Sequence, residues 1–311
     1  MRMLLLGARG AVGRVVRRDL EKRGHLVTAT SRSETEDVQV DLGGDLSALA
    51  GLAGGFDAVI NASGIERADV AVAVGETPFI EISATGAYLE ALRLTASGGV
   101  LLGAGLAPGL STVLASSVAN GVDDVDVLIM LGSGERHGPA AVAWTAGLVG
   151  TDLYRPAEGG SVRNLRESLR APGPNGRVRR YLRADFPDHV LLNAPVRSYL
   201  ALGSSPMTAA LDLVGRMPAL RGLLTSAPHF GSDAWHVVAR NRRTEERREV
   251  SGQGQSEATG RLTALATERL VESGTTDAVT MADLITPEEC TAVLRPVSGL
   301  SVTPASDPPG L

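Results

Sequence analysis

The sequence predicts an α/β fold, in which a doubly wound parallel sheet carries an inserted second domain of α+β type. Residues 3–30 read as strand, glycine loop, helix and strand. Strand and helix patterns then alternate as far as about residue 118. After that point longer strands are predicted at 125–131 and on both sides of a charged hairpin, followed by a helix at 256–272. The chain is therefore expected to leave the first domain and to return to it.

Length and composition support two globular domains. At about 150 residues per domain, 311 residues suggest a first domain of 1–118, completed by 255–311, and a second of 119–254. The net charge of −5 argues against nucleic-acid binding through positive charge. No apolar run approaches the roughly 20 residues of a membrane span. We therefore expect a cytoplasmic protein with neither nucleic-acid nor membrane partners.

Rare residue types exclude several kinds of chemistry. Cys290 is the only cysteine, which excludes an intrachain disulfide and a cysteine-based zinc site. Lys22 is the only lysine and falls in the first predicted helix, so no other lysine remains for a Schiff base. No histidine pair has metal-ligand spacing, and we expect no metal.

The first predicted strand, 3–6, runs into a G-x-x-G-x-x-G loop and a helix at 12–23. Gly7 allows a sharp turn, Gly10 allows a pyrophosphate to approach the backbone, and Gly13 allows the helix to pack. The helix N-terminus offers free N–H groups to the phosphates. The loop, with Arg9, Ala11 and Val12 between and beside the glycines, therefore predicts a Rossmann-type dinucleotide site.

The end of the second strand indicates which cofactor is preferred. Enzymes that use NAD usually carry an acidic residue there, but this chain has Ser31-Arg32-Ser33. Arg32 can pair with a 2′-phosphate, and the serines can donate to it. Glu34 comes later in the chain. We therefore expect NADP(H) rather than NAD(H), the alternative being that Arg32 is a solvated loop residue.

Further cofactor contacts are predicted at the ends of the next strands, because parallel strands present their carboxyl ends to a dinucleotide. Strands are expected at 38–42, 56–60, 78–83 and 100–103, with helices at 45–52, 68–74 and 88–94 between them. The residues predicted to line the cofactor are Asp41 and Leu42 beside the adenine, Asn61, Ala62, Ser63 and Gly64 after the fourth strand, and Ser83 and Thr85 on the nicotinamide side.

Several segments together resemble the saccharopine dehydrogenase-like superfamily of NAD(P)-dependent oxidoreductases. The first segment is the glycine loop, 7–13, together with residues 31–32, and the second is 56–62 together with 79–83. The third is 105–110, and the fourth is 252–259 together with 286–289. The resemblance implies the inserted second domain and a homodimer that pairs through the sheet of that domain. Two positions depart from the family, since many relatives carry an acidic residue in place of Ala107 and Asp in place of Glu81. The family's amino-acid-binding residues cannot be located, so saccharopine itself is not implied as the substrate.

Candidate catalytic groups are few. None of the four tyrosines has a lysine four residues on, and no Gly-x-Ser-x-Gly motif is present. His137 follows a glycine turn and Tyr154 follows the helix predicted at 139–148, so either can donate a proton; each can equally be an ordinary loop residue.

These observations predict an NADP(H)-dependent oxidoreductase. Reduction of a protonated imine needs little catalytic help beyond placement of the carbon, which suits a chain with few reactive groups. We expect action on a C–N bond of a small amino-acid-like or polyamine-like metabolite. The alternatives are a C=C or C=O reductase on the same fold, and a non-catalytic NADP(H)-binding sensor or scaffold protein.

Overall fold

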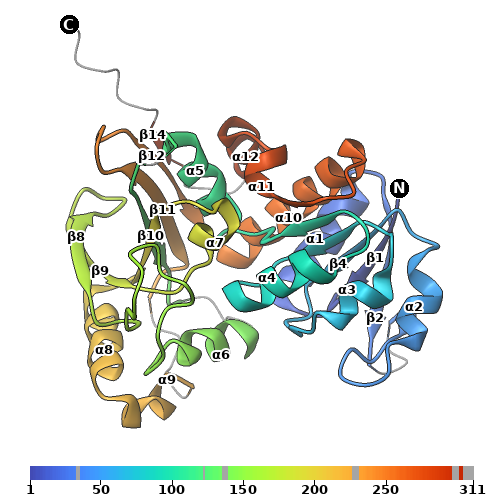
Figure 1. Cartoon of the computed structure of the whole chain (residues 1–311), viewed down its shortest axis with the longest axis horizontal. Helices are drawn as coiled ribbons and strands as arrows, with labels where there is room; N and C mark the ends of the chain where they lie inside the picture. Colours follow the sequence, from blue (N-terminus) through green and yellow to red (C-terminus); the bar gives the residue numbers. More distant parts are fainter. Residues whose placement is uncertain (33–35, 122, 135–138, 226–230, 296–300, 304–311) are drawn as a thin grey trace, which may run out of the picture. The chain divides into compact units, whose positions relative to one another are not determined.

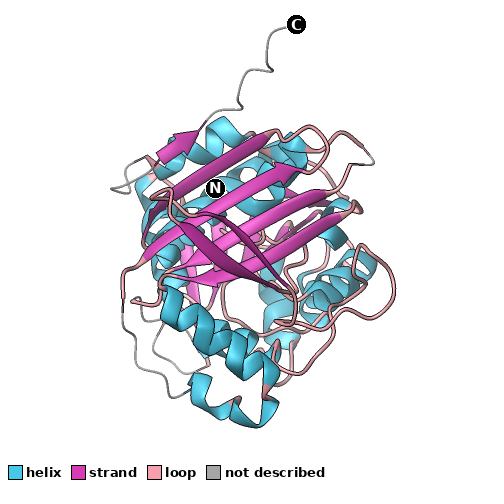
Figure 2. Cartoon of the chain, turned by 90° about the vertical axis from the view of Figure 1, so that its left-hand side faces the viewer, coloured by secondary structure: helices cyan, strands magenta, loops and turns pink. Residues whose placement is uncertain are grey.

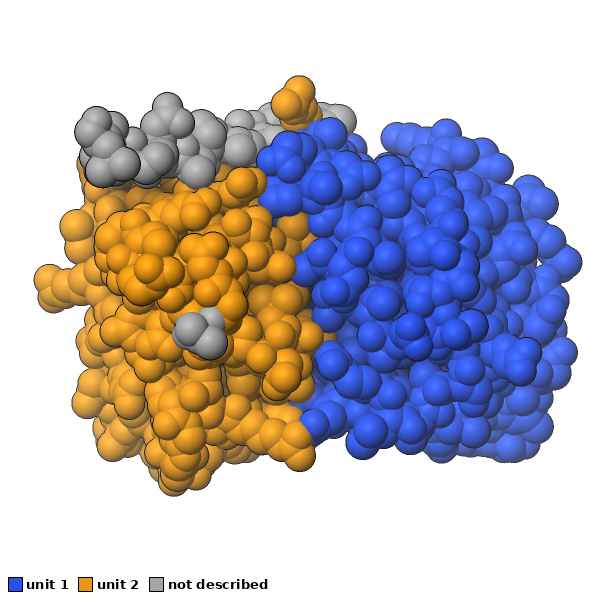
Figure 3. Space-filling view, turned by 45° about the horizontal axis from the view of Figure 1, so that its top comes forward, with its two compact units in different colours: residues 1–110, 256–293 blue, residues 111–255, 294–311 orange. Residues whose placement is uncertain are grey.

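The computed structural model describes residues 1–32, 36–121, 123–134, 139–225, 231–295 and 301–303 (Figure 1). The chain divides into two compact units (Figure 3). Unit 1 consists of Met1–Leu110 and Ser256–Val293, and unit 2 of Ser111–Gln255 and Leu294–Leu311. Unit 1 contains a parallel sheet flanked by helices, and unit 2 contains a second, mixed sheet. The predicted fold class is thereby confirmed. Within the described residues, no helix is long and apolar enough to cross a membrane.

The sheet of unit 1 is parallel throughout, in the order β13-β6-β5-β4-β1-β2-β3. Its strands are β1 (Arg2–Leu6), β2 (Leu26–Ser31), β3 (Val38–Gln39), β4 (Ala58–Asn61), β5 (Phe79–Glu81), β6 (Val100–Leu102) and β13 (Ala278–Thr280). The order in which the chain adds strands to the sheet reverses between β1 and β4: β2 and β3 follow on one side of β1, and β4, β5 and β6 on the other. Ligands of open α/β sheets bind at such a reversal, outside the carboxyl ends of the strands.

The helices of unit 1 are α1 (Ala11–Lys22), α2 (Ser47–Ala53), α3 (Asp69–Val74), α4 (Gly86–Thr95), α10 (Gln255–Ser273), α11 (Met281–Leu284) and α12 (Pro287–Leu294). Helix α1 buries Val15, Val16 and Leu20, which recur at helical spacing. The helix predicted at 256–272 is present as α10 and packs against α1, where Gly260 leaves room for Val15.

The sheet of unit 2 has the order β14-β12-β11-β7-β10-β9-β8, with β7 and β10 parallel and its other pairs antiparallel. Its strands are β7 (Val125–Leu131), β8 (Ser168–Pro172), β9 (Val178–Arg183), β10 (Val196–Leu202), β11 (Ala234–Asn241), β12 (Arg247–Gln253) and β14 (Ser301–Thr303). Strand β14 pairs antiparallel with β12 at the edge of this sheet.

The helical elements of unit 2 are α5 (Leu110–Val118), α6 (Pro139–Gly147), α7 (Asp188–Leu192), α8 (Ser205–Arg216), η1 (Pro218–Leu220) and α9 (Gly222–Thr225). Helices α5 and α7 cover one face of the sheet, since Ser198 of β10 donates to Asp188 and Asn241 of β11 donates to the Val118 carbonyl. We call the opposite face, which carries Leu128, Met130, Tyr181, Tyr199 and Val238, the outer face. Figure 2 looks onto the strands of this sheet.

Candidate functional site

The glycine loop joins β1 to α1 at the carboxyl-terminal edge of the unit 1 sheet. Gly7 has a φ of +85°, and a Cβ there would lie 2.5 Å from the Cα of Ser63 in the loop after β4. A Cβ on Gly13 would overlap the Gly7 carbonyl oxygen. Both positions therefore require glycine. A Cβ on Gly10 would lie 3.3 Å from the Gly7 carbonyl oxygen, which is a tight contact, so this position also favours a backbone without a side chain.

The N-terminus of α1 follows Gly10 and has no side-chain cap. Its first turn, from Ala11 to Gly13, carries backbone N–H groups and the positive end of the helix dipole. Such an end binds phosphate groups. The loop thus has the backbone conformation and the charge that a pyrophosphate requires.

The end of β2 carries the two residues that were predicted to select the cofactor. Ser31 is buried, and Arg32 directly after it is exposed. The Gln39 side chain donates to the Arg32 carbonyl oxygen at 2.9 Å, which ties the end of β2 to β3. Ser33 and Glu34 lie outside the described residues.

The strand predicted at 38–42 is shorter in the structure, where β3 ends at Gln39. The Asp41 carboxylate accepts a hydrogen bond from the Gly43 N–H at 2.9 Å. This side-chain-to-backbone bond forms a turn, which explains the early end of the strand. Leu42 is buried, and its carbonyl oxygen accepts a hydrogen bond from Arg67 at 2.8 Å.

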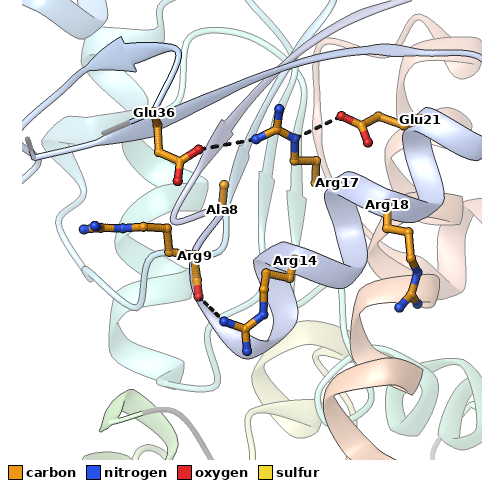
Figure 4. Close-up of a pocket in the computed structure, with 7 residues that line it drawn as sticks. All are labelled: Ala8, Arg9, Arg14, Arg17, Arg18, Glu21 and Glu36. Carbon is orange, nitrogen blue, oxygen red and sulfur yellow. Dashed lines mark hydrogen bonds and ion pairs between the residues drawn. The ribbon is translucent and has the colours of Figure 1, made fainter. Parts of the chain in front are cut away.

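A cavity of about 470 Å³ lies beside the glycine loop (Figure 4). Its lining residues are Ala8, Arg9, Arg14, Arg17, Arg18, Glu21 and Glu36. Arg17 donates to Glu21 at 2.9 Å and to Glu36 at 3.3 Å, and Arg14 donates to the Arg9 carbonyl oxygen at 2.9 Å. Arg17 also pairs with Asp37 at 3.6 Å, and Arg18 pairs with Glu257 at 2.6 Å, so carboxylates hold two of the four arginines of the lining.

The sequence reasoning missed the arginines that α1 contributes to this cavity. Arg14, Arg17 and Arg18 recur three and four residues apart, which is the spacing of one helix face. That spacing was the available signal, and it places cations beside the predicted phosphate loop.

A second polar group, which we call the Glu81 cluster, lies at the ends of β4 and β5 and comprises Asn61, Ser63, Glu81, Ser83 and Tyr88. The sheet register pairs Asn61 with Glu81. The Glu81 carboxylate accepts from Asn61 Nδ2 at 2.7 Å, from the Tyr88 hydroxyl at 2.9 Å and from the Ser83 N–H at 2.8 Å. Asn61 Oδ1 accepts from the Ser63 hydroxyl at 2.6 Å. The carboxylate therefore joins the loops that follow both strands.

Burial dominates the electrostatics of this cluster. Glu81 has no exposed surface, and its burial raises the pKa of the carboxyl to about 7, against the opposing effect of the hydrogen bonds from Ser83, Tyr88 and Asn61. Burial, together with the charge of Glu81, also raises the pKa of Tyr88. Tyr88 is thus a hydrogen-bond donor here and not an acid that ionises near neutral pH.

The remaining residues predicted to line the cofactor, Ala62, Gly64 and Thr85, lie in the loops after β4 and β5. The Ala62 N–H donates to the Leu6 carbonyl oxygen at 2.9 Å, which holds the loop after β4 beside the glycine loop. Gly64 has a φ of +76°. The Thr85 hydroxyl donates to Glu66 at 2.9 Å and forms a second link between the loops after β4 and β5.

The predicted proton donors both belong to unit 2. His137 lies outside the described residues. Tyr154 is half-buried, with the Arg155 guanidinium carbon 5.2 Å from the centre of its ring. The Tyr154 N–H donates to Asp185 at 3.1 Å, and Nε2 of His189 lies 2.7 Å from the Tyr154 carbonyl oxygen. Since a carbonyl oxygen only accepts, His189 Nε2 carries a proton.

Asp185 and His189 were not predicted. Asp185 Oδ1 and His189 Nδ1 are buried and have no hydrogen-bond partner in the part of the chain that the structure describes. The Asp-x-x-x-His spacing was visible in the sequence. It fell between residues 110 and 252, outside the segments that resemble the family, where no pattern marked α7 as a helix.

All of the predicted cofactor residues lie at, or directly after, the carboxyl ends of β1 to β5 in unit 1, and Tyr154 lies in unit 2. The fold therefore gathers the cofactor candidates at one edge of one sheet. Their roles as contacts remain predictions.

Comparisons with known proteins bear on the fold. No protein-family model matches the chain, and no curated protein matches it in sequence. A solved structure of homospermidine synthase from Legionella pneumophila in complex with NAD is similar, with a TM-score of 0.65 and 11% identity over 97% of this chain and 91% of that one. The C. glutamicum DAP dehydrogenase has a TM-score of 0.48 and 13% identity over 93% and 95% of the two chains. The first likeness shows that this chain shares the fold of that protein.

Proposed function

We propose that the protein is an NADP(H)-dependent oxidoreductase of the saccharopine dehydrogenase-like type. It transfers a hydride to or from a C–N bond of a small amino-acid-like or polyamine-like metabolite. The observation that carries the proposal is the uncapped N-terminus of α1 behind the Gly7–Gly13 turn, at the reversal of the unit 1 sheet.

The residues present suit a dinucleotide phosphate. The absence of a side chain at Gly10 and the N–H groups of the first turn suit the pyrophosphate. Arg9 and Arg14, which line the cavity beside this loop, and exposed Arg32 at the end of β2 support a 2′-phosphate. Guanidinium groups bind phosphate through paired, charge-assisted hydrogen bonds.

When bound, the nicotinamide ring would accept or supply the hydride. The chain's own contribution is then to place the reactants, and the loops after β4 and β5 hold the nicotinamide end of the cofactor. Tyr154 or His137 donates a proton to the substrate nitrogen. The likeness to homospermidine synthase supports a polyamine-like substrate, because the product in that enzyme's name is a polyamine.

Calorimetry with NADPH and NADH tests the cofactor. We expect the unmutated protein to prefer NADPH, and Arg32→Ala to weaken NADPH by tenfold or more with NADH nearly unchanged, since a charge-assisted bond contributes about 1.5–3 kcal/mol. Equal affinity for both cofactors would contradict the proposal.

A substrate panel tests the reaction class. Consumption of NADPH with imines, or with pairs of amines and keto acids, is the expected result. Consumption only with enones or simple carbonyls would indicate a C=C or C=O reductase. Tight binding of NADPH without turnover on any of these substrates would indicate a sensor or scaffold protein.

We also propose a homodimer formed through the outer face of the unit 2 sheet. Helices α5 and α7 cover the opposite face of this sheet. A sheet covered by helices on one side leaves a face that monomers rarely expose, and two such faces related by a twofold axis bury each other. Light scattering should give twice the 32.2 kDa mass of the chain, and a mass of one chain would contradict the dimer.

A further inference from the structure

We infer that Glu81 is the positioning residue for the nicotinamide half of the cofactor, holding the loops after β4 and β5 in the conformation to which that half binds. This inference rests on the proposed function. Glu81 has no exposed surface, so it acts through the loops and makes no contact with the cofactor itself.

The sheet order assigns the two halves of the cofactor to different strands. A dinucleotide lies across the reversal between β1 and β4, with its pyrophosphate at α1 and its adenosine toward the end of β2. The nicotinamide half is left with the ends of β4, β5 and β6. Leu6, Asn61, Glu81 and Leu102 form one row across these strands, which places Glu81 in the middle of that half.

The hydrogen bonds of Glu81 cross from one loop to the other. Asn61 begins the loop after β4 and Ser83 lies in the loop after β5, and both donate to the carboxylate. Tyr88 of α4 donates from a third direction. The outer link between the same loops, from Thr85 to Glu66, is exposed to solvent and is correspondingly weak. Glu81 is therefore the buried connection between them.

The surroundings require a carboxyl group in this position. Asn61 cannot turn its amide round, because its Oδ1 accepts from Ser63 and its Nδ2 also donates to the Ile65 carbonyl oxygen at 3.1 Å. The Ser83 N–H is a fixed donor as well. A glutamine at position 81 would direct an amide hydrogen at one of these donors in either orientation of its side chain.

The test separates the two halves of the cofactor. Affinities for NADPH and for 2′,5′-ADP, which lacks the nicotinamide half, are measured by calorimetry on the full chain. We expect Glu81→Gln to weaken NADPH at least tenfold and to leave 2′,5′-ADP within twofold. Tyr88→Phe, which removes one donor and keeps the carboxylate, should weaken NADPH about threefold. Retained binding of 2′,5′-ADP shows that each variant is folded in unit 1.

Asp212→Asn is the matched control, because this carboxylate of α8 is also buried and accepts from Arg180 at 2.9 Å and Arg216 at 3.1 Å, but lies in unit 2. It should change neither affinity. Parallel losses of both ligands in Glu81→Gln, or no loss of either, would overturn the inference. If the unmutated protein binds NADPH no more tightly than 2′,5′-ADP, the inference fails and the cofactor proposal stands. If it binds neither ligand, both fail.

Discussion

Glu81 in unit 1 and Asp188 in unit 2 are carboxylates without exposed surface, but different donors surround them. Glu81 accepts from a side-chain amide, a backbone N–H and a tyrosine hydroxyl. Within the described residues of unit 2, the Asp188 carboxylate accepts from three hydroxyls: Ser111 at 2.8 Å, Thr112 at 2.7 Å and Ser198 at 3.2 Å. Burial raises the pKa of both carboxyl groups.

The difference lies in what each site tolerates. A hydroxyl can rotate and become an acceptor, so the surroundings of Asp188 can adapt to a neutral group that donates. Amide and backbone N–H groups can only donate, so the surroundings of Glu81 demand an acceptor. Asp188 is thus an adaptable connection between α5, α7 and β10, and Glu81 is a rigid one between two loops.

The largest expected effect is the pH dependence of unit 1. The folded pKa of Glu81 is raised from 4.5 to about 7, so the folded state holds the proton more tightly than the unfolded chain. Its contribution to the free energy of unfolding is full below pH 4.5 and is lost as the pH rises through 7. The loss amounts to about 3 kcal/mol. Glu81→Gln should flatten this dependence.

Two intrinsic probes separate the units in this measurement. Cys290, the only cysteine, is buried in unit 1, and labelling of its thiol in urea reports the unfolding of that unit. Both tryptophans, Trp144 and Trp235, belong to unit 2, so their fluorescence reports the other. If Cys290 labelling has the same pH dependence in Glu81→Gln as in the unmutated protein, the pH dependence of unit 1 arises from a group other than Glu81.

Amide substitution of the two carboxylates sharpens the comparison directly. Near pH 7, Glu81→Gln should lower the free energy of unfolding of unit 1 by about 1–3 kcal/mol, because one donor is left facing another. Asp188→Asn should change unit 2 by less than about 1 kcal/mol, since Ser198 can turn to accept from the new amide. Cys290 labelling and tryptophan fluorescence measure the two free energies of unfolding. Equal losses in the two variants would show that the type of hydrogen-bond donor around the carboxylate does not matter.

The smallest expected effects come from removing one donor at each site. Tyr88→Phe should cost about 1 kcal/mol in unit 1, the net value of a buried hydrogen bond. Ser198→Ala should cost less in unit 2, because its 3.2 Å bond is the longest of the three to Asp188 and the other hydroxyls remain. Thiol labelling and fluorescence again provide the readout. A larger loss for Ser198→Ala would reverse the ranking.

Local patterns were sufficient to predict most of unit 1. The strand at 3–6, the glycine loop and the apolar spacing of α1 lie close together in the sequence and form one βαβ unit. Asn61 and Ser83 were predicted because they end parallel strands. The role of Glu81 was not predicted, because its three donors come from separate segments and only the sheet register brings them together.

Unit 2 was much less predictable. Strands β7, β11 and β12 carry clear apolar patterns, whereas β9 contains four arginines or tyrosines in six residues and does not resemble a buried strand. Arg183 is nevertheless buried there, paired with Glu158 at 3.1 Å. Such pairs depend on residues far apart in the chain, which no local pattern shows. Asp185 and His189 escaped prediction for a different reason: they are only four residues apart, but no pattern marked α7 as a helix.

Strand β14 has a consequence for solubility. By pairing with Glu249, Val250 and Ser251, the three residues Ser301–Thr303 cover the hydrogen-bonding edge of β12. An uncovered edge is a template on which another chain can add a strand and begin to aggregate. These three residues thus protect part of the β12 edge from the addition of a foreign strand, and removal of the residues after 295 should yield a protein that aggregates on concentration.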